Sequence, residues 1–323
     1  MQVSIIIVTY NRAMDLEKCL DFILFQTILP KEVIIVDNGN SAGTEQLIKR
    51  KKDEFETKAI SLKYIENNKE NSLTVGRNIG AQNAKGEIVV FLDDDVVLDK
   101  EYIKEILMVY ENHPNAMGVH GYIYNLNKKF LRIKNLFGRF FFLGYISENE
   151  CNILPSVTTT YPVPLSKIIS CQWLSGANHS YKKRILEEFK YDEKLKKWSQ
   201  CEDIDFSYRV FKKYSGSLYI TPYAKLTHRV SPEGRMPKKE LVNMCEVYEL
   251  YFFYRNIEQT LKNKLIYLWS RVGKLIFNIL RSSVELSKNG FIENMYLSGA
   301  YINCIKHLKE IKNGNIEFFN KTL

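Results

Sequence analysis

Four short runs of aliphatic and β-branched residues, separated by helix-like segments, dominate the first hundred residues of the chain. They are VSIIIV (3–8), EVIIVD (32–37), LKYI (62–65) and EIVVFL (87–92). Continuous apolar runs of this kind are typical of strands that are buried on both faces of a parallel sheet. Between the first two runs, Leu16, Leu20 and Ile23 recur at helical spacing. The alternation predicts βαβ units and an α/β fold, with a mostly parallel sheet flanked by helices.

Polar side chains follow three of these four runs directly. The residues TYNR (9–12) come after the first run, Asp37 ends the second, and DDD (93–95) follows the fourth. In open α/β sheets, ligands bind beyond the carboxyl ends of the strands. We therefore expect these three polar clusters to meet at one cleft.

The run of three aspartates is the most constrained of these clusters, because adjacent carboxylates repel one another and at least one pKa must rise. In extended chain, Asp93 and Asp95 point to the same side, whereas Asp94 turns away or pairs elsewhere. Two carboxylates on one face suit Mg²⁺ or Mn²⁺, which would also relieve the repulsion. The alternative is an acidic loop in which Asp99 caps the next helix. We favour the cation site, because an apolar strand leads directly into the triplet.

The second half of the chain is less regular. Residues 125–170 show no clear periodicity, and a strand-and-turn pattern resumes at CQWLSGANHSYKK (171–183). Helices are expected near 182–189 and from 201 to 213, followed by extended chain over 217–228. The turn-like SPEGRMP (231–237) marks a boundary, and the remainder is predicted to be mainly helical.

Charge and cysteine content restrict the class of protein. The net charge is +9, and from Arg235 onward 14 Lys or Arg stand against 8 Glu and no Asp. Such a bias suits an anionic surface, and we expect membrane headgroups rather than nucleic acid. Two interpretations of the C-terminal helices remain open: a membrane-surface element, or a helical cap that packs on the rest of the chain or on a second copy in a homodimer.

The six cysteines are scattered, and the chain shows neither a signal-peptide pattern nor an apolar run of the ~18–20 residues that span a bilayer. We therefore expect a cytoplasmic protein, peripheral on the inner face of the membrane.

Several motifs, taken in order, resemble those of the family 2 glycosyltransferases, which have the GT-A fold. They are VSIIIVTYNR, VIIVDNGN, GRNIGAQNAKGEIVVFLDDD and WLSGA followed by CEDIDFSYR, and together they cover roughly residues 2–230. The resemblance implies a catalytic domain at 1–232, with a nucleotide-sugar-binding half up to about 98 and an acceptor half at about 99–232. Residues 233–323 would form a helical extension. It also implies that the aspartate triplet is the DXD motif, which holds the donor and its divalent metal.

The donor-binding residues that the resemblance implies are Thr9, Tyr10, Arg12, Asp37, Arg77, Asn78, Asp93 and Asp94. Asp37 matches the acid that hydrogen-bonds the base, and a carboxylate can accept from an imide N–H. Arg77 matches an element beside the base and ribose, and an arginine can neutralise phosphate. Taken singly, Asp37 could be a turn residue and Arg77 a solvated helix charge.

Glu202 and Asp203 match the family's ED motif, in which the aspartate serves as catalytic base and the glutamate lies on the acceptor side. Asp203 would also stand at the start of a helix, where free N–H groups and the dipole stabilise a carboxylate. A simple N-cap is therefore the alternative, and Asp205 is a neighbouring candidate for the base.

By the same resemblance, His228 is a further metal ligand beside Asp93 and Asp95, although a lone histidine is often structural. The acceptor-binding residues would be Trp173, Gly176, Ala177, Asn178 and Glu202. A flat aromatic face stacks well on a sugar ring. The alternative for the tryptophan is a place in the core.

These observations predict a glycosyltransferase that uses Mn²⁺ or Mg²⁺ and inverts the anomeric centre. Its donor would be a UDP- or dTDP-linked sugar and its acceptor a hydroxyl of a glycan or lipid-linked glycan, in cell-surface polysaccharide or glycoconjugate synthesis. One alternative is a sugar nucleotidyltransferase, against which the absence of glycine in TYNR counts. Another is a non-catalytic nucleotide-binding scaffold at the membrane surface, against which the intact acidic motifs count.

Overall fold

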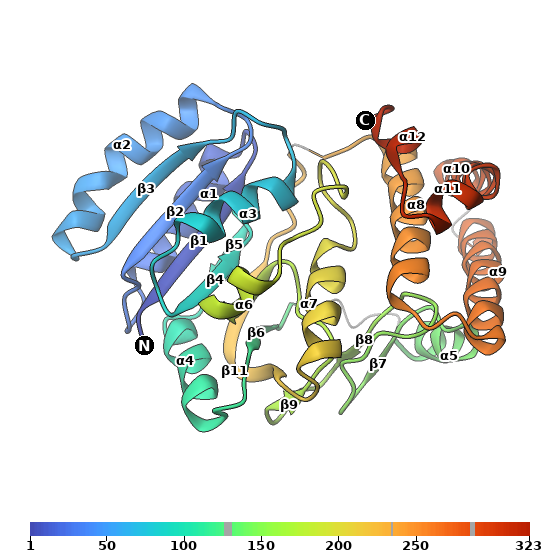
Figure 1. Cartoon of the computed structure of the whole chain (residues 1–323), viewed down its shortest axis with the longest axis horizontal. Helices are drawn as coiled ribbons and strands as arrows, with labels where there is room; N and C mark the ends of the chain where they lie inside the picture. The colour runs from blue at the N-terminus through green and yellow to red at the C-terminus, as the bar shows by residue number, and fades with distance from the viewer. Residues whose placement is uncertain (126–130, 234, 285–287) are drawn as a thin grey trace. The chain divides into compact units, whose positions relative to one another are not determined.

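The structure is a computed structural model that describes residues 1–125, 131–233, 235–284 and 288–323 (Figure 1). The chain divides into two compact units: unit 1 comprises Met1–Leu126 and Leu165–Arg235, and unit 2 comprises Asn127–Pro164 and Met236–Leu323. The second segment of unit 1 ends at Arg235, and the predicted catalytic domain ends at residue 232. Residues 127–164, however, group with the C-terminal helices rather than with the predicted acceptor half. Residues 126–130, within the stretch 125–170 that shows no clear periodicity, lie outside the described residues.

Unit 1 is built on a mixed sheet with the strand order β3-β2-β1-β4-β10-β6-β11-β5, and β9 pairs with β11. The strands are β1 (Val3–Thr9), β2 (Glu32–Asp37), β3 (Ser61–Glu66), β4 (Ile88–Leu92), β5 (Val96–Leu98), β6 (Gly118–Ile123), β9 (Ile169–Ser170), β10 (Asn178–Lys182) and β11 (Leu218–His228). The first four strands in this order are parallel, which confirms the predicted βαβ pattern. Strand β10 runs antiparallel between β4 and β6.

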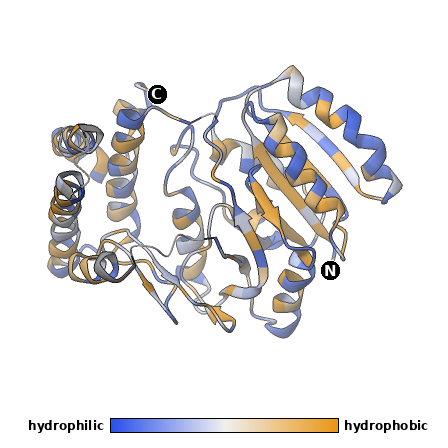
Figure 2. Ribbon diagram, turned by 180° about the vertical axis from the view of Figure 1, so that it is seen from behind, coloured by the Kyte–Doolittle hydropathy of each residue, from blue (hydrophilic) through white to orange (hydrophobic). Residues whose placement is uncertain are grey.

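Helices flank this sheet, as the sequence predicts. They are α1 (Ala13–Leu24), α2 (Ala42–Thr57), α3 (Leu73–Asn83), α4 (Tyr102–Asn112), α6 (Lys183–Glu188) and α7 (Glu202–Lys213). Leu16, Leu20 and Ile23 of α1 are fully buried in the core, so the helical periodicity identifies the face that packs on the sheet. The orange strands in the middle of the sheet in Figure 2 are the continuous apolar runs of the sequence.

The register of the parallel strands brings the polar clusters to one edge of the sheet. Thr9 at the end of β1 pairs with Asp37 at the end of β2, and Ile7 pairs with Leu92, the last residue of β4. The aspartate triplet therefore leaves the sheet beside the TYNR loop. Helix α3 packs tightly on β1, because a Cβ atom at Gly80 would lie 2.4 Å from the side chain of Ile6. This close approach fixes the position of α3 against the sheet.

Unit 2 consists mainly of helices. They are α5 (Leu131–Phe141), α8 (Lys238–Asn256), α9 (Leu261–Val284), α10 (Lys288–Lys306), α11 (Leu308–Lys312) and α12 (Glu317–Asn320), with a two-stranded sheet of β7 (Tyr145–Ser147) and β8 (Thr160–Pro162). Helix α9 packs against α5 and α10, and α10 also packs against α8. Among the described residues, no helix has the length and apolar character needed to cross a bilayer.

Candidate active site

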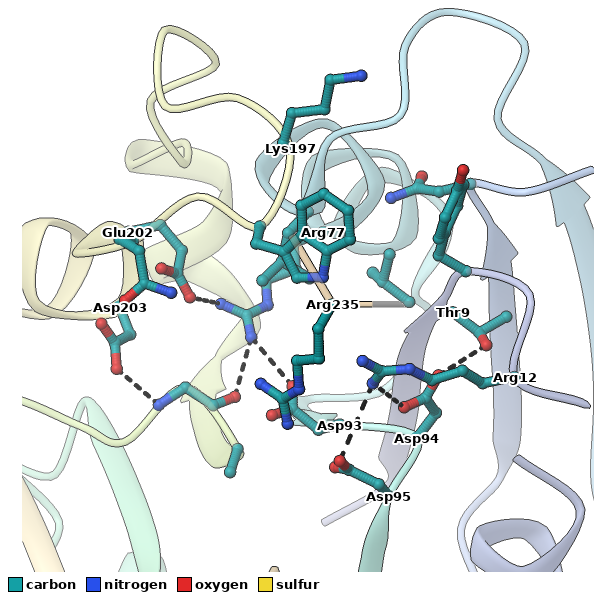
Figure 3. A pocket seen from close by; sticks show the side chains of 18 of the residues that line it. Thr9, Arg12, Arg77, Asp93, Asp94, Asp95, Lys197, Glu202, Asp203 and Arg235 are labelled. Carbon is teal, nitrogen blue, oxygen red and sulfur yellow. Dashed lines mark hydrogen bonds and ion pairs between the residues drawn. The ribbon is translucent and has the colours of Figure 1, made fainter. Parts of the chain in front are cut away.

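A cavity of about 340 Å³ opens at the edge of the sheet in unit 1 (Figure 3). Its walls come from four parts of the chain: the loop after β1, the triplet after β4, residues 175–177 before β10, and residues 197–203 at the start of α7. The lining also includes Asn38, Asn71, Leu73, Arg77, His228 and Arg235. The predicted convergence of polar clusters beyond the strand ends therefore occurs for the TYNR loop and the triplet.

Within the triplet, Asp94 is occupied by protein partners. The hydroxyl of Thr9 donates to Asp94 Oδ2 at 2.7 Å, and Arg12 Nη1 donates to Asp94 Oδ1 at 3.1 Å. Burial raises the pKa of Asp94 to about 7, although Arg12 and Thr9 oppose this shift. Arg12 also donates to the backbone oxygen of Glu233, at 2.7 Å from Nη2. These bonds tie the TYNR loop to the triplet and to the chain after β11.

Asp93, Asp95 and His228 form a second group in the cavity. One ligand atom from each lies within 4.8 Å of the others, and His228 Nε2 is 3.0 Å from Asp95 Oδ1. Asp95 Oδ1 is nevertheless buried without a hydrogen bond within the described part of the chain, whereas Asp95 Oδ2 accepts from the Ser231 N–H. A buried carboxylate oxygen that faces an imidazole nitrogen and a second carboxylate fits a divalent cation.

The pKa shifts show how strongly this group attracts positive charge. Burial alone would lower the pKa of His228, but Asp95 and Asp93 outweigh burial and raise it. Burial alone would raise the pKa of Asp95, but His228, the Ser231 N–H and Arg12 outweigh burial and lower it. The two carboxylates therefore favour the protonated, positively charged form of the His228 ring.

Arg77 connects the two acidic motifs. It is 2% exposed, and its guanidinium donates to Glu202 Oε1 at 2.8 Å and to the backbone oxygen of Gly176 at 2.9 Å. Asp93 Oδ1 lies 3.5 Å from Nη2 of the same guanidinium. Arg77 is therefore not a solvated helix charge, because three acceptors from separate segments already surround it.

The first turn of α7 presents Glu202 and Asp203 to the cavity. Asp203 Oδ2 accepts from the Gly176 N–H and Oδ1 from the Ile204 N–H, both at 2.8 Å. Burial raises the pKa of Asp203, and burial together with Asp203 raises that of Glu202 to about 8, against the opposing effect of Arg77. A Cβ atom at Gly176 would lie 3.1 Å from Asp203 Oδ2, so a larger residue would require this carboxylate to shift by a few tenths of an ångström.

Asp205, the neighbouring candidate for the base, does not line the cavity. It is 2% exposed and pairs with Arg209 at 2.9 Å, one turn further along α7. The helical spacing turns its side chain away from that of Asp203. The fold therefore separates the two candidates for the base that the sequence left open.

The loop before α7 carries lining residues that the sequence analysis did not identify: Lys197, Trp198, Gln200 and Cys201. Lys197, Ser199 and Cys201 have positive φ angles of 56°, 49° and 71°, a conformation that costs non-glycine residues energy. The loop is held against α3, since the Leu73 N–H donates to the Lys197 carbonyl. Trp198 meets Tyr10 edge-on at 6.1 Å between ring centroids. In the sequence, the feature that could have indicated this loop is Trp198, an aromatic residue four positions before Glu202.

Four of the predicted site residues are absent from the lining: Asp37, Asn78, Trp173 and Asn178. All four are at most 9% exposed. Asp37 accepts from the N–H groups of Gly39 and Ser41, which is the turn role considered as its alternative. Asn78 and Asn178 hydrogen-bond to other parts of the fold. Their contacts with donor or acceptor stay predictions, whereas Thr9, Tyr10, Arg12, Gly176 and Ala177 do line the cavity.

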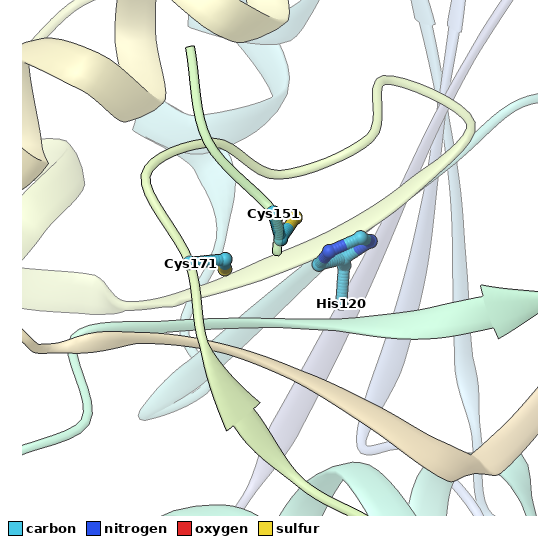
Figure 4. A group of neighbouring side chains, drawn as sticks. All are labelled: His120, Cys151 and Cys171. Atoms are coloured by element: carbon cyan, nitrogen blue, oxygen red, sulfur yellow. The ribbon is translucent and has the colours of Figure 1, made fainter. Parts of the chain in front are cut away.

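Figure 4 shows a further set of side chains, His120, Cys151 and Cys171. His120 lies on β6 and Cys171 follows β9, both buried in unit 1, whereas Cys151 belongs to unit 2. Burial lowers the pKa of His120 to about 3, so its ring is neutral at physiological pH. We assign no site to this set, because its members belong to different units.

Comparisons with known proteins point to one family. A family profile described as Glycosyl transferase family 2 matches residues 4–164. The chain is 32% identical over 124 residues to the glucosyl-dolichyl phosphate glucuronosyltransferase of Haloferax volcanii, covering 38% of each chain. It is 27% identical over 198 residues to glycosyltransferase GlyA of Streptococcus pneumoniae serotype 4, covering 59% of this chain and 26% of that one. The matched part thus spans well under half of these relatives' own length.

Solved structures show the same fold at low sequence identity. The crystal structure of S. aureus TarS 1–349 aligns with a TM-score of 0.55 and 16% identity, covering 98% of this chain and 84% of that one. The mannosyltransferase PcManGT from Pyrobaculum calidifontis, in complex with GDP-Man and Mn²⁺, aligns with a TM-score of 0.60 and 15% identity, covering 94% and 87%. At such identities the likeness establishes the shared architecture.

Proposed function

Since this chain belongs to glycosyl transferase family 2 and has the GT-A fold, we propose that it transfers a sugar from a nucleotide-diphospho-sugar to an acceptor hydroxyl in a metal-dependent, inverting reaction. One observation carries this proposal. In a single cavity, a cation-attracting group of Asp93, Asp95 and His228 lies opposite an acidic pair at a helix start, and Arg77 bridges them.

Asp93, Asp95 and His228 are the residues that would hold the cation. Two carboxylates with one imidazole suit Mn²⁺ better than Mg²⁺, which prefers oxygen ligands alone. The structure of PcManGT in complex with GDP-Man and Mn²⁺ supports this choice. When bound, the cation would act as a Lewis acid on the departing nucleoside diphosphate.

Asp203 would accept the proton of the attacking hydroxyl. Each of its oxygens receives one backbone N–H, from Gly176 and from Ile204, and each keeps a further lone pair for an acceptor hydroxyl. These two bonds hold the carboxylate in one orientation at the cavity wall. Because burial raises its pKa, the carboxylate is a stronger base than an exposed aspartate.

The basic residues of the lining would bind the charged part of the donor. Lys197 and Arg235 both face the cavity, and Arg235 is oriented by a hydrogen bond from Nε to the Ser231 carbonyl at 2.7 Å. Arg77 is held by Glu202 and the Gly176 carbonyl, so its role is to position the acidic pair against the triplet. The diphosphate would thus meet Lys197 and Arg235 rather than Arg77.

For the substrates, we propose a UDP- or dTDP-linked hexose as donor and a glycan or lipid-linked glycan as acceptor, in cell-surface polysaccharide or glycoconjugate synthesis. The UDP and UDP-GlcNAc complexes of TarS support the uridine donor. The similarity to the glucosyl-dolichyl phosphate glucuronosyltransferase of Haloferax supports a lipid-linked acceptor.

The test is release of free nucleoside diphosphate when the protein is incubated with a panel of nucleotide-sugars and acceptors, with Mn²⁺ and with chelator. We expect release that depends on both the cation and one donor. Release of pyrophosphate from a nucleoside triphosphate and a sugar phosphate would instead identify a nucleotidyltransferase. Binding of nucleotide without release of any product across the panel would favour a scaffold. The anomeric configuration of the product, read by NMR, tests inversion.

A further inference from the structure

Helix α9 in unit 2 turns its apolar side outward. Six aliphatic residues recur along it at spacings of three and four, and each is between 37% and 74% exposed. They are Leu261, Leu265, Leu268, Val272, Ile276 and Ile279, and we call them the α9 stripe. Residues at these spacings lie on one face of a helix. In a water-soluble protein, a surface helix normally packs such an apolar face against the core.

Two charged residues in the middle of the same helix point the opposite way. Arg271 is 7% exposed, and its Nη1 lies 2.9 Å from Glu246 Oε2 of α8; it also pairs with Glu249. Lys274, one turn further, pairs with Glu246 as well. Turning the α9 stripe inward would require these cations to leave their carboxylates, which would then be buried without partners. The ion pairs therefore hold α9 with its apolar face exposed.

Helix α5 extends the apolar area. Trp269 of α9 donates from its indole nitrogen to the Phe140 carbonyl at 3.0 Å, and the two rings meet edge-on at 5.6 Å. Phe140 and Leu136 of α5 are 62% and 72% exposed. The α9 stripe, Trp269, Phe140 and Leu136 together form what we call the docking surface. Monomeric proteins rarely expose a contiguous apolar area of this kind without a partner for it.

Charge indicates which partner covers this surface. Unit 2 contains 18 Lys and Arg, 10 Glu and no Asp, so it carries +8 of the chain's +9. Exposed cations lie next to the docking surface, namely Lys262 and Lys264 on α9 and Arg139 on α5. An apolar helix face flanked by basic residues is typical of helices that lie in the interface of an anionic bilayer. A second copy would bring two units of +8 together, which electrostatic repulsion opposes.

We propose that the docking surface binds the surface of an anionic lipid bilayer, with α9 lying along the membrane plane. The apolar residues would enter the boundary between headgroups and acyl chains, and Lys262, Lys264 and Arg139 would meet the anionic headgroups. This binding needs neither donor nor cation, so it stands independently of the proposed glycosyl transfer.

The test is sedimentation of the full chain with vesicles of phosphatidylglycerol and phosphatidylcholine, and with phosphatidylcholine alone. The variant Leu268→Glu/Ile276→Glu places two charges in the α9 stripe. The matched control Phe25→Glu/Met108→Glu makes the same change at two exposed apolar positions of unit 1. We expect the parent and the control to bind the anionic vesicles, and the stripe variant to lose at least ~10-fold in partitioning. Binding by the stripe variant equal to that of the parent would overturn the proposal.

A second measurement remains informative even if the variant Leu268→Glu/Ile276→Glu does not fold. Vesicles with brominated acyl chains should quench the fluorescence of the parent, and Trp269→Phe should remove most of that quenching. Quenching that survives this substitution would place another tryptophan in the lipid and contradict the assignment. If the parent does not sediment with vesicles but light scattering shows a dimer that the stripe variant dissociates, the surface binds a second copy and the lipid proposal is wrong. Nucleoside diphosphate binding, measured in parallel, reports on the cavity separately.

Discussion

Replacing Asp203 with asparagine tests the catalytic base, and the structure predicts two separate effects. The first concerns stability. Both carboxylate oxygens accept a backbone N–H, from Gly176 and Ile204, whereas asparagine offers one oxygen and one NH₂ group. Either the Gly176 N–H or the Ile204 N–H would then face the NH₂ group of the asparagine, which is also a donor. Losing a hydrogen bond to a charged acceptor costs about 1.5–3 kcal/mol, but the neutral amide avoids the burial penalty that raises the pKa of Asp203. We expect a net loss of about 1–2 kcal/mol.

The second effect concerns turnover. Proton transfer to a positioned base is typically worth about 10²–10⁴-fold, so Asp203→Asn should lower kcat by at least ~100-fold. A domain with about 5–15 kcal/mol of stability stays folded after the loss estimated above. Donor binding should therefore persist, because the residues that meet the nucleotide and the cation are unchanged.

The assay combines kcat from nucleoside diphosphate release, calorimetry of nucleoside diphosphate binding with Mn²⁺, and a thermal melt. Glu202→Gln and Asp205→Asn are the controls, since one neighbours the base in the cavity and the other pairs with Arg209 outside it. Near-parental turnover of Asp203→Asn, combined with a large loss in either control, would refute the assignment. A loss of donor binding in Asp203→Asn would show that the carboxylate organises the cavity rather than takes the proton.

Three further predictions follow from the same cavity. Above about pH 8, where Glu202 is ionised, Arg77→Met leaves Glu202 and Asp93 without their buried cation, so the free energy of unfolding in denaturant should fall by about 3–5 kcal/mol; a second change, Glu202→Met, should restore part of it, and simple additivity would contradict the pairing. Asp95→Asn should abolish the enhancement of nucleoside diphosphate binding by Mn²⁺ in calorimetry, and an enhancement equal to that of the parent would remove Asp95 from the ligand set. Because the pKa of Glu202 is raised from 4.5 to about 8, the folded state retains a proton that the unfolded state loses, so stability should fall as pH rises across this window. In thermal melts, the melting temperature of Glu202→Gln should fall less steeply with rising pH than that of the parent. Identical slopes in parent and variant would argue against the raised pKa of Glu202.

The sequence alone determined much of unit 1, because local signals and global packing agree there. Continuous apolar runs can be satisfied only by strands buried on both faces, and the intervening helical periodicity supplies the layers that cover them. The position of the aspartate triplet followed as well, since a residue that comes directly after a buried strand must lie at the sheet edge. The motif order was sufficient to indicate the family.

Only the tertiary structure decided how the acidic residues are used. No pattern in the sequence shows that Asp94 pairs with Thr9 and Arg12, or that Arg77 bridges Asp93 and Glu202, because these partners come from segments up to 125 residues apart. The insertion of the antiparallel strand β10 brings Gly176 to Asp203, and that pairing depends on the whole sheet.

The division of the chain and the orientation of α9 were likewise invisible in the sequence. Residues 127–164 lack a clear period, so nothing local assigns them to unit 2. For α9, the apolar stripe predicts an amphipathic helix, and the ordinary expectation is that this stripe packs inward. The rotation of the helix depends instead on carboxylates of α8, Glu246 and Glu249, which pair with Arg271 and Lys274. Periodicity shows that a helix has two faces, but only its neighbours in space determine which one is exposed.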